Sequence, residues 1–444
     1  MTRTVLLTGA TGFVGKVVLE ELLRRREQLG VGSVLVLVRA GDPEHAAARC
    51  RADVFASPCF AAHPRGWEAR VEPLPGDVTR PGLGLAPLAR ARVAAEVTHV
   101  IHCAASVEFT LPLAEALAVN TRGALNALEI ARACARLESY VGVSTAYVTP
   151  HPDPYGRRNG RRAHRAEEVL APLPRDPESL YESLCAGTEE EARLLAETGH
   201  PNTYTLTKCL AEHLTVARAS DLPVSIVRPS IVSACRAHPV PGWIDSAAAF
   251  AAFVAMIGAG KLRVLAGDPH TRLDVVPCDS VSERIVAAAF APPPRGAPRI
   301  QHAVAGLASA LPISLCREGI VDYFRDHPAG GRARVEYVGR RGRATRAAHA
   351  LRHELPGLGA ALWLELKSRP QQARAIRKLV ERQRVLNDDF AYFTHATLDF
   401  ASSSKCDPPL EPAEYLATVC RGVSRHLLRR ADRPRRAAVA ARAR

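Results

Sequence analysis

The sequence predicts an α/β fold, with a doubly wound parallel sheet followed by a small, mainly helical C-terminal domain. Two observations carry this prediction. Short apolar runs alternate with helical patterns over residues 1–327, and a glycine-rich loop directly follows the first run. Alternation of this kind is typical of parallel strands joined by helices. A chain of 444 residues is also long enough to form two domains.

We expect strands at six runs that are rich in valine, leucine, isoleucine or tyrosine. In a parallel sheet the carboxyl ends of the strands share one edge, and ligands bind in the crevice outside that edge. Residues that follow the strands are therefore candidates for cofactor contacts. The strands are expected at 3–8, 33–38, 70–74, 98–103, 140–144 and 223–228, and the candidates behind them are Asp77, Val78, Cys103, Ala104, Ala105, Pro229, Ser230 and Ile231.

The segment TGATGFVG at residues 8–15 connects the first strand to a helix expected from Val14 to about Arg26. Gly9 permits a tight turn, Gly12 lets the backbone approach a pyrophosphate, and Gly15 allows close packing of the helix. The helix N-terminus offers unpaired N–H groups to the phosphates. The pattern indicates a Rossmann-type dinucleotide site, and the expected contacts are Thr8, Gly9, Thr11, Gly12, Phe13, Val14 and Gly15.

The second strand ends in Arg39, where the adenosine ribose lies in such a fold. An acidic residue there would accept a hydrogen bond from the 2'-hydroxyl of NAD, whereas arginine can pair with the 2'-phosphate of NADP. Because arginine is abundant in this chain, Arg39 is also compatible with an ordinary surface position. We favour NADPH as the cofactor.

Tyr204 and Lys208 form the most informative pair in the chain. Among nine tyrosines this one alone has a lysine four residues later, although the chain contains few lysines. Residues four apart lie on the same face of a helix. A lysine ammonium can lower the pKa of the tyrosine and can also donate to ribose hydroxyls. The pair is therefore a candidate proton donor with its activating cation, and the alternative is a solvated pair on a surface helix.

Half of the formal charge of +14 lies in the final twenty residues, which contain eight arginines and one aspartate. The rest of the chain is only mildly basic, which argues against a nucleic-acid-binding face. A mildly basic surface also suits a phosphate-rich ligand such as coenzyme A. We expect residues 424–444 to be a disordered basic tail. The alternative is an amphipathic helix in peripheral contact with a membrane.

Cysteine usage and the start of the chain predict a cytoplasmic protein. The eleven cysteines contain no Cys-x-x-Cys pair, and the sequence enters the first strand without a secretory signal. No histidine spacing predicts a metal site. The apolar run at 247–260 is too short to span a bilayer. We expect it to form a buried helix or the wall of an apolar substrate channel.

The expected domains are a cofactor-binding domain at 1–327 and a helical domain at 340–423. Residues 151–200 interrupt the strand and helix rhythm and are expected to form a helical insertion over the site. The prolines at 292–294 precede another strand and a helix that ends near Phe324. The boundary falls between about 328 and 343, and a helix at 373–386 is followed by the aromatic stretch at 390–393.

The sequence resembles the extended short-chain dehydrogenase/reductase superfamily, and within it the fatty acyl-CoA reductases, which have a male-sterility-type NAD-binding domain. The superfamily resemblance rests on residues 8–15, Asp77, Asn120, Ser144, Thr145, Tyr204 and Lys208. The narrower one rests on the strings at 143–148, 201–208, 227–232, 241–245, 258–261 and 274–279, and more thinly on 387–390 and 397–400. One departure is Leu-Pro-Ile-Ser at 311–314, where the family usually shows Asn-Pro-x-Thr-Trp.

The resemblance implies NADPH-dependent reduction of a long-chain acyl-CoA thioester to a fatty alcohol through an aldehyde. It implies Tyr204 as general acid, with Lys208 and the cofactor lowering its pKa. It implies Thr145, or its neighbour Ser144, as a donor to the developing oxyanion. Asn120 would hold a relay behind Lys208. Both hydroxyls also suit caps at a strand end, and Asp77 suits either an adenine contact or a turn.

Three other functions stay open at this point. A sibling reductase would release aldehyde or alcohol from acyl chains bound to a carrier protein, with the same catalytic residues. A sugar-nucleotide epimerase or hydroxysteroid dehydrogenase is less compatible with the apolar run at 247–260. A non-catalytic NADP-binding protein would usually have lost the tyrosine or the lysine. Acyl chain length and oligomeric state are not predicted.

Overall fold

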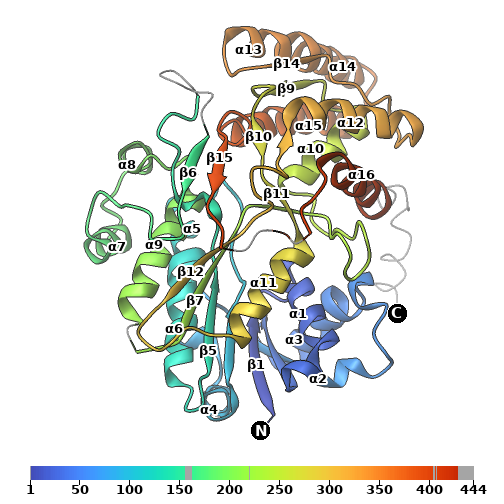
Figure 1. Cartoon of the computed structure of the whole chain (residues 1–444). Coiled ribbons are helices and arrows are strands. Elements are labelled where there is room, and N and C mark those ends of the chain that lie inside the picture. Colours follow the sequence, from blue (N-terminus) through green and yellow to red (C-terminus); the bar gives the residue numbers. More distant parts are fainter. Residues whose placement is uncertain (1, 156–162, 220, 404–405, 407, 429–444) are drawn as a thin grey trace.

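The computed structural model describes residues 2–155, 163–219, 221–403, 406 and 408–428. Its centre is a seven-stranded parallel sheet with the order β12-β7-β5-β4-β1-β2-β3 (Figure 1). The predicted α/β fold class is therefore confirmed, and each expected strand is present within two residues of its predicted limits. The strands are β1 (Arg3–Thr8), β2 (Val31–Arg39), β3 (Val71–Gly76), β4 (His99–His102), β5 (Ser139–Val143), β7 (Val224–Pro229) and β12 (Arg299–Ala303).

Strand β1 is the centre of a doubly wound topology. It pairs in parallel with β2 on one side and with β4 on the other, so that Val5 faces both Val34 and His99. The chain winds outward from β1 through β2 and β3, and then in the other direction through β4, β5, β7 and β12. The order therefore reverses between β1 and β4, and a ligand crevice forms at such a point.

Helices cover both faces of the sheet, which explains why its central strands β1 and β2 are largely apolar. Val5 and Leu7 pack in the core cluster that contains residues of α1 and α11, whereas Leu6 packs in the second cluster with residues of α6. The helices of the first face are α1 (Phe13–Arg24), α2 (Arg26–Leu29), α3 (Pro43–Cys50) and α11 (Cys278–Phe290), and those of the second are α4 (Pro87–Glu96), α5 (Leu113–Ala116), α6 (Gly123–Ala133) and α9 (Thr203–Arg218).

The expected helical insertion contains two helices, α7 (Pro177–Cys185) and α8 (Glu191–Thr198). Leu180, Leu184 and Leu194 of these helices pack against leucines of α9. The segment also contains a short strand, β6 (His164–Ala166), which pairs with β15 (Leu398–Phe400). The purely helical prediction was wrong at this point, because the partner strand lies more than two hundred residues away and gives no local signal.

Smaller elements surround the sheet. Helix α10 (Ala249–Gly258) is almost entirely buried, which confirms the buried-helix interpretation of the apolar run. Strand β8 (Ile231–Ser233) pairs with β11 (Val275–Pro277), β9 (Val264–Ala266) with β14 (Tyr337–Gly339), and β10 (Arg272–Leu273) with β13 (Leu311–Pro312). Helix α12 (Ile313–Asp326) ends two residues after Phe324, close to its expected end.

The C-terminal region is mainly helical. It contains α13 (Arg343–His349), the π-helical segment η7 (Ala350–Glu354), α14 (Leu355–Leu366), α15 (Pro370–Asp389) and α16 (Pro412–Gly422). The expected basic tail begins within the turn η8 (Val423–Leu428), and its residues 429–444 lie outside the described residues. No helix within the described ranges is long and apolar enough to cross a membrane.

Candidate active site

The N-terminus of α9 positions the tyrosine and lysine pair. The side chain of Asn202 caps the helix by accepting a hydrogen bond of 2.9 Å from the backbone N–H of Thr205. The Thr203 hydroxyl donates to the carbonyl of Leu111 at 2.8 Å and ties the first turn to the loop after β4. Tyr204 and Lys208 follow within the first turns, on the same face of this anchored helix.

Lys208 is 3% exposed, so the alternative of a solvated surface pair is wrong. Its ammonium donates a hydrogen bond of 2.8 Å to the carbonyl oxygen of Val143, at the carboxyl end of β5. Burial lowers the pKa of Lys208 to about 8, and the charges of Cys103 and Glu212 partly oppose this shift. Helix α9 therefore places a partly desolvated amine at the ligand-binding edge of the sheet.

Tyr204 is partly buried, and its phenol lies close enough to Thr145 for that side chain to affect its pKa. Burial raises the pKa of Tyr204 to about 12, and the interaction with Thr145 works against this rise. Desolvation of the phenolate therefore outweighs the favourable interaction here, whereas the predicted lowering depends on Lys208 together with a bound nicotinamide cofactor. The phenol is protonated at neutral pH and can serve as a proton donor.

The structure brings Thr145 to Tyr204 and also gives it a capping role. The Thr145 hydroxyl accepts a hydrogen bond of 3.3 Å from the N–H of Tyr147 and thereby begins the short turn η6 (Ala146–Val148). It is also within 3.5 Å of the carbonyl oxygen of Pro229, to which it can donate. The cap and the contact with the phenol are compatible, because one hydroxyl both accepts and donates.

Ser144 and Asn120 lie near the pair but make different contacts. The Ser144 hydroxyl is buried and has no hydrogen-bond partner among the described residues. Asn120 accepts from the N–H of Ser106 at 2.9 Å and donates to the hydroxyl of Thr207 at 3.1 Å. Asn120 therefore joins the loop after β4 to α9 beside Lys208, rather than contacting the ammonium directly.

The glycine loop has the shape that a pyrophosphate requires. Gly9 has a φ of +78°, and a Cβ atom there would lie 2.7 Å from the backbone nitrogen of Ala104. A Cβ atom on Gly15 would lie 2.1 Å from the carbonyl oxygen of Gly9. No side chain caps the N-terminus of α1 and its first turn contains no acidic residue, so its N–H groups can receive phosphate oxygens.

Thr8 and the residues after β4 form the wall between the loop and α9. The Thr8 hydroxyl accepts from the N–H of Ala104 at 3.1 Å and lies 2.9 Å from Nδ1 of His102. These bonds hold the end of β1 against the Cys103–Ala105 segment. Thr8 thus fixes one wall of the crevice by joining the ends of β1 and β4.

The segment after β8 covers the glycine loop, a feature that the sequence reasoning missed. The ring of Trp243 lies 5.4 Å from that of Phe13, centroid to centroid. Lys16, in the first turns of α1, forms an ion pair with Asp245 of the same segment. Residues 241–245 contributed to the family resemblance, but no role was predicted for them. Lys16 could have been suspected only from its position directly after the glycine loop.

Arg39 lies at the carboxyl end of β2 with an exposed side chain, and its guanidinium has no partner among the described residues. Asp77 makes the contacts of a turn residue, because its carboxylate accepts from the N–H and the hydroxyl of Thr79 at 2.9 and 2.8 Å. The carbonyl of Val78 accepts from Asn126 at 2.7 Å. Arg39 is therefore free to meet an anionic ligand, whereas Asp77 and Val78 are engaged in the loop after β3.

Ser230 does not turn its hydroxyl to the crevice. It donates to the buried carboxylate of Asp274 at 2.5 Å, and this carboxylate also accepts from the N–H groups of Ala305 and Gly306 at 2.9 and 2.8 Å. Burial raises the pKa of Asp274 above its ordinary value. Pro229 and Ile231 flank this network, so the loop after β7 is fixed in place beside Thr145.

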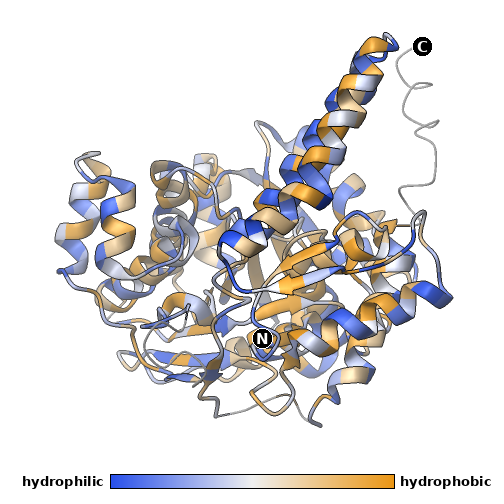
Figure 2. Cartoon of the chain, turned by 90° about the horizontal axis from the view of Figure 1, so that it is seen from above, coloured by the Kyte–Doolittle hydropathy of each residue, from blue (hydrophilic) through white to orange (hydrophobic). Residues whose placement is uncertain are grey.

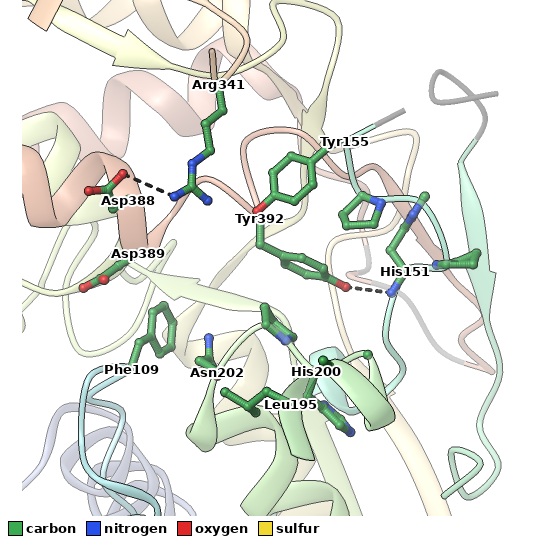
Figure 3. Close-up of a pocket in the computed structure, with 15 residues that line it drawn as sticks. Phe109, His151, Tyr155, Leu195, His200, Asn202, Arg341, Asp388, Asp389 and Tyr392 are labelled. Carbon is green, nitrogen blue, oxygen red and sulfur yellow. Dashed lines mark hydrogen bonds and ion pairs between the residues drawn. The ribbon is translucent and has the colours of Figure 1, made fainter. Parts of the chain in front are cut away.

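A cavity of about 450 Å³ lies at the N-terminal end of α9, where Asn202 lines it and Tyr204 does not (Figure 3). Phe109 connects it to the pair, since its ring lies 5.8 Å from that of Tyr204 and 5.4 Å from those of Phe390 and Phe393. On the opposite wall, Arg341 lies 3.8 Å from the carboxylate of Asp388. The Tyr392 hydroxyl accepts from the N–H of His151 at 2.8 Å.

The cavity is lined by residues from three distant parts of the chain, and none of them was predicted from the sequence as a lining residue. The loop after β4 contributes Phe109, the insertion contributes residues such as His151 and Tyr155, and the region after residue 340 contributes residues such as Arg341 and Tyr392. The aromatic stretch at 390–393 was the available signal. Burial, followed by the charge of Asp388, raises the pKa of Asp389 above its ordinary value. The cavity is therefore lined by both aromatic and charged side chains.

Comparison with known proteins places this arrangement in a family. The family model described as male sterility protein, an NAD-binding domain, matches residues 7–285, which contain the glycine loop, Thr145, Tyr204 and Lys208. The chain belongs to the male sterility protein family. Its crevice is therefore a binding site for a nicotinamide dinucleotide, which agrees with the fit of the glycine loop to a pyrophosphate.

Two curated relatives of this male sterility family protein illustrate its similarities. It is 34% identical over 295 residues to "Fatty acyl-CoA reductase wat" of Drosophila melanogaster, covering 65% of this chain and 54% of the relative. It is 28% identical over 359 residues to "Alcohol-forming fatty acyl-CoA reductase" of Simmondsia chinensis, covering 73% and 71%. The chain spans about half the length of the first of these relatives.

A solved structure supports the fold of the family protein. The terminal R domain from the myxalamid PKS-NRPS biosynthetic pathway superimposes with a TM-score of 0.63 at 20% identity, covering 95% of this chain and 90% of that domain. At this level of identity the likeness concerns the fold alone. It extends beyond the sheet to most of the C-terminal region.

Proposed function

We propose that this protein is an NADPH-dependent reductase that converts a long-chain fatty acyl-CoA thioester to a fatty alcohol through an aldehyde. The observation that carries the proposal is the proximity of the Tyr204 phenol to Thr145, with the buried Lys208 one helical turn further along α9. The names of the similar proteins, fatty acyl-CoA reductases, support the substrate class. The unpartnered guanidinium of Arg39 supports NADPH over NADH, because it can pair with a 2'-phosphate.

When bound, the nicotinamide cofactor supplies the hydride for each reduction. The Tyr204 phenol donates the proton to the oxygen of the attacked carbonyl, and the Thr145 hydroxyl stabilises the negative charge that develops on that oxygen. The resulting hemithioacetal breaks its carbon–sulfur bond and releases the thiol and an aldehyde. A second hydride and a second proton, again from Tyr204, give the alcohol.

The other residues hold the reactants. The glycine loop and the N-terminus of α1 would receive the pyrophosphate, and Lys208 would donate to ribose hydroxyls while it remains fixed to Val143. The cavity beside Phe109 would accept the acyl thioester close to the phenol. The Ser144 hydroxyl lies at the same edge and is the second candidate donor to the oxyanion.

The decisive experiment is a product assay on the purified chain. It supplies NADPH or NADH with a long-chain acyl-CoA or with the same acyl chain on a carrier protein, and it quantifies thiol, aldehyde and alcohol. We expect acyl-CoA to be consumed with two NADPH oxidised per alcohol formed. Preference for the carrier-protein thioester, or accumulation of aldehyde, would reassign the substrate or the product.

The same assay on Tyr204→Phe tests the mechanism. We expect turnover to fall by at least about a hundredfold, the usual contribution of a general acid, while NADPH binding is retained. Tyr337→Phe, on strand β14, is the matched control and should keep full activity. Binding of NADPH without turnover of any thioester by the native protein would instead favour a non-catalytic role.

A further inference from the structure

The helix formed by α13, η7 and α14 carries its large apolar residues outward. In the described part of the chain ten large hydrophobic side chains are exposed, and six of them lie between residues 351 and 366, each 56–78% exposed. Five are the leucines at 351, 355, 358, 362 and 366, and the sixth is Trp363. Their spacing of three or four residues places the leucines on one face of the helix. They form an apolar ridge about 20 Å long.

The side of α14 that faces α15 is built from small residues. Ala361 and Ala373 are fully buried between the two helices together with Leu364. A Cβ atom on Gly357 would lie 2.4 Å from Val380, so the helices approach closely. Intramolecular packing therefore accounts for the small residues, whereas the exposed leucines pack in no core cluster of the described residues. Figure 2 shows a long helix of mixed hydropathy that projects beyond the body of the molecule.

The same region is strongly basic. Residues 340–384 contain twelve lysine and arginine residues against three glutamates, a formal charge of +9. On the ridge helix itself, Glu365 is paired with Arg377 at 2.9 Å and Glu354 lies 3.2 Å from His349. Seven of the cations have no acidic partner among the described residues: Arg343, Arg346, Lys367, Arg369, Arg374, Lys378 and Arg382.

We propose that the leucine ridge of α13–α14 docks on the surface of an anionic lipid bilayer. An apolar ridge with free cations at both ends can bury its leucines at the level of the headgroups while arginine and lysine meet lipid phosphates. Trp363 is suited to the same interface. A second copy of this chain is a poorer occupant, because two surfaces of charge +9 would repel each other.

The location of the leucine ridge suits a reductase of long acyl chains. This argument alone rests on the proposed function. The ridge helix begins two residues after Arg341, which lines the cavity at the N-terminal end of α9. A bilayer at the ridge would hold amphiphilic substrates near that cavity. The docking itself needs no reductase activity and can be measured without substrate.

The test is flotation of the full-length protein with lipid vesicles. We expect binding to phosphatidylcholine vesicles that contain phosphatidylserine, and this binding should weaken in high salt. The double variant Leu358→Gln/Leu362→Gln should weaken this binding by at least about tenfold, because it removes two apolar side chains that the bilayer would bury. Leu88→Gln is the matched control, since Leu88 is 87% exposed elsewhere on the molecule and should leave binding unchanged.

A charge variant separates the electrostatic part. Lys367→Glu/Arg369→Glu should weaken binding to the anionic vesicles by about tenfold, whereas Arg65→Glu/Arg70→Glu, two exposed cations of the body, should not. Equal binding to pure phosphatidylcholine, or binding that the leucine variant leaves intact, would overturn the proposal. A dimer in solution that the leucine variant dissociates, without any vesicle binding, would overturn it in favour of a second copy.

Measuring reductase turnover beside vesicle binding separates a failure of the docking proposal from a failure of the proposed reaction. The leucine variant should keep native turnover of a water-soluble, short-chain acyl-CoA, since its substitutions lie outside the cavity. If the protein binds vesicles but reduces no thioester, the docking surface is supported and the proposed reaction is refuted.

Discussion

The ammonium of Lys208 donates a hydrogen bond of 2.8 Å to the carbonyl oxygen of Val143, two residues before Thr145. This bond joins helix α9 to the carboxyl end of β5. It brings the lysine, the threonine and Tyr204 into one cluster, although Val143 and Lys208 are 65 residues apart in the sequence. This cluster leads to two predictions, and the cofactor-binding residues Arg39 and Gly15 lead to two more.

The first prediction separates the two candidate hydroxyls. Thr145→Val should lower the turnover number by about a hundredfold to a thousandfold, the usual effect of losing one oxyanion donor, with little change in NADPH affinity. Ser144→Ala should lower it less, because Thr145 is the hydroxyl residue that affects the pKa of the Tyr204 phenol. Steady-state kinetics and fluorescence titration of NADPH measure both variants. A larger loss in Ser144→Ala would transfer the oxyanion role to that residue.

The second prediction concerns pH. Burial lowers the pKa of Lys208 to about 8, so the amine loses its charge as the pH rises through that value. If the charged form is required, kcat/KM should fall on the alkaline side near pH 8, while the Tyr204 phenol, with a pKa of about 12, stays protonated. Lys261→Met, an exposed lysine, should leave the profile unchanged. A flat profile up to pH 10 would contradict a role for the charged lysine.

The third prediction concerns cofactor choice. Arg39→Ala should raise the KM for NADPH by about tenfold or more and leave that for NADH nearly unchanged, because the variant removes a cation that can pair with the 2'-phosphate. Arg70→Ala, another exposed arginine, should change neither value. Equal losses with both cofactors would show that Arg39 has only a structural role.

The fourth prediction concerns the glycine loop. Gly15→Ala should abolish dinucleotide binding and lower the thermal stability, since its Cβ atom would lie 2.1 Å from the carbonyl oxygen of Gly9 and the backbone must shift. Gly41→Ala is the matched control, because no atom lies within 4 Å of the new methyl group. Isothermal titration with NADPH and thermal unfolding measure both effects. Normal binding by Gly15→Ala would mean that the loop can rearrange at little cost.

The cofactor half of the site was accessible from the sequence because its signals are local. A strand, a glycine turn and a helix follow one another within residues 3–24, and their geometry depends mainly on neighbouring residues. The spacing of Tyr204 and Lys208 is likewise a property of one helix. The parallel sheet followed from the alternation of apolar runs, and the structure reproduces it with shifts of one or two residues at the strand ends.

The sequence alone thus determined the fold class, the glycine loop and the tyrosine and lysine pair, since each depends on contacts between residues that are close in the chain. Tertiary structure decided which hydroxyl meets Tyr204, how burial moves the pKa values of Tyr204 and Lys208, and which residues line the cavity. These properties depend on Phe109, Arg341 and Tyr392, which come together from distant segments. Desolvation and cavity shape arise only when such segments pack against one another, so no local pattern could encode them.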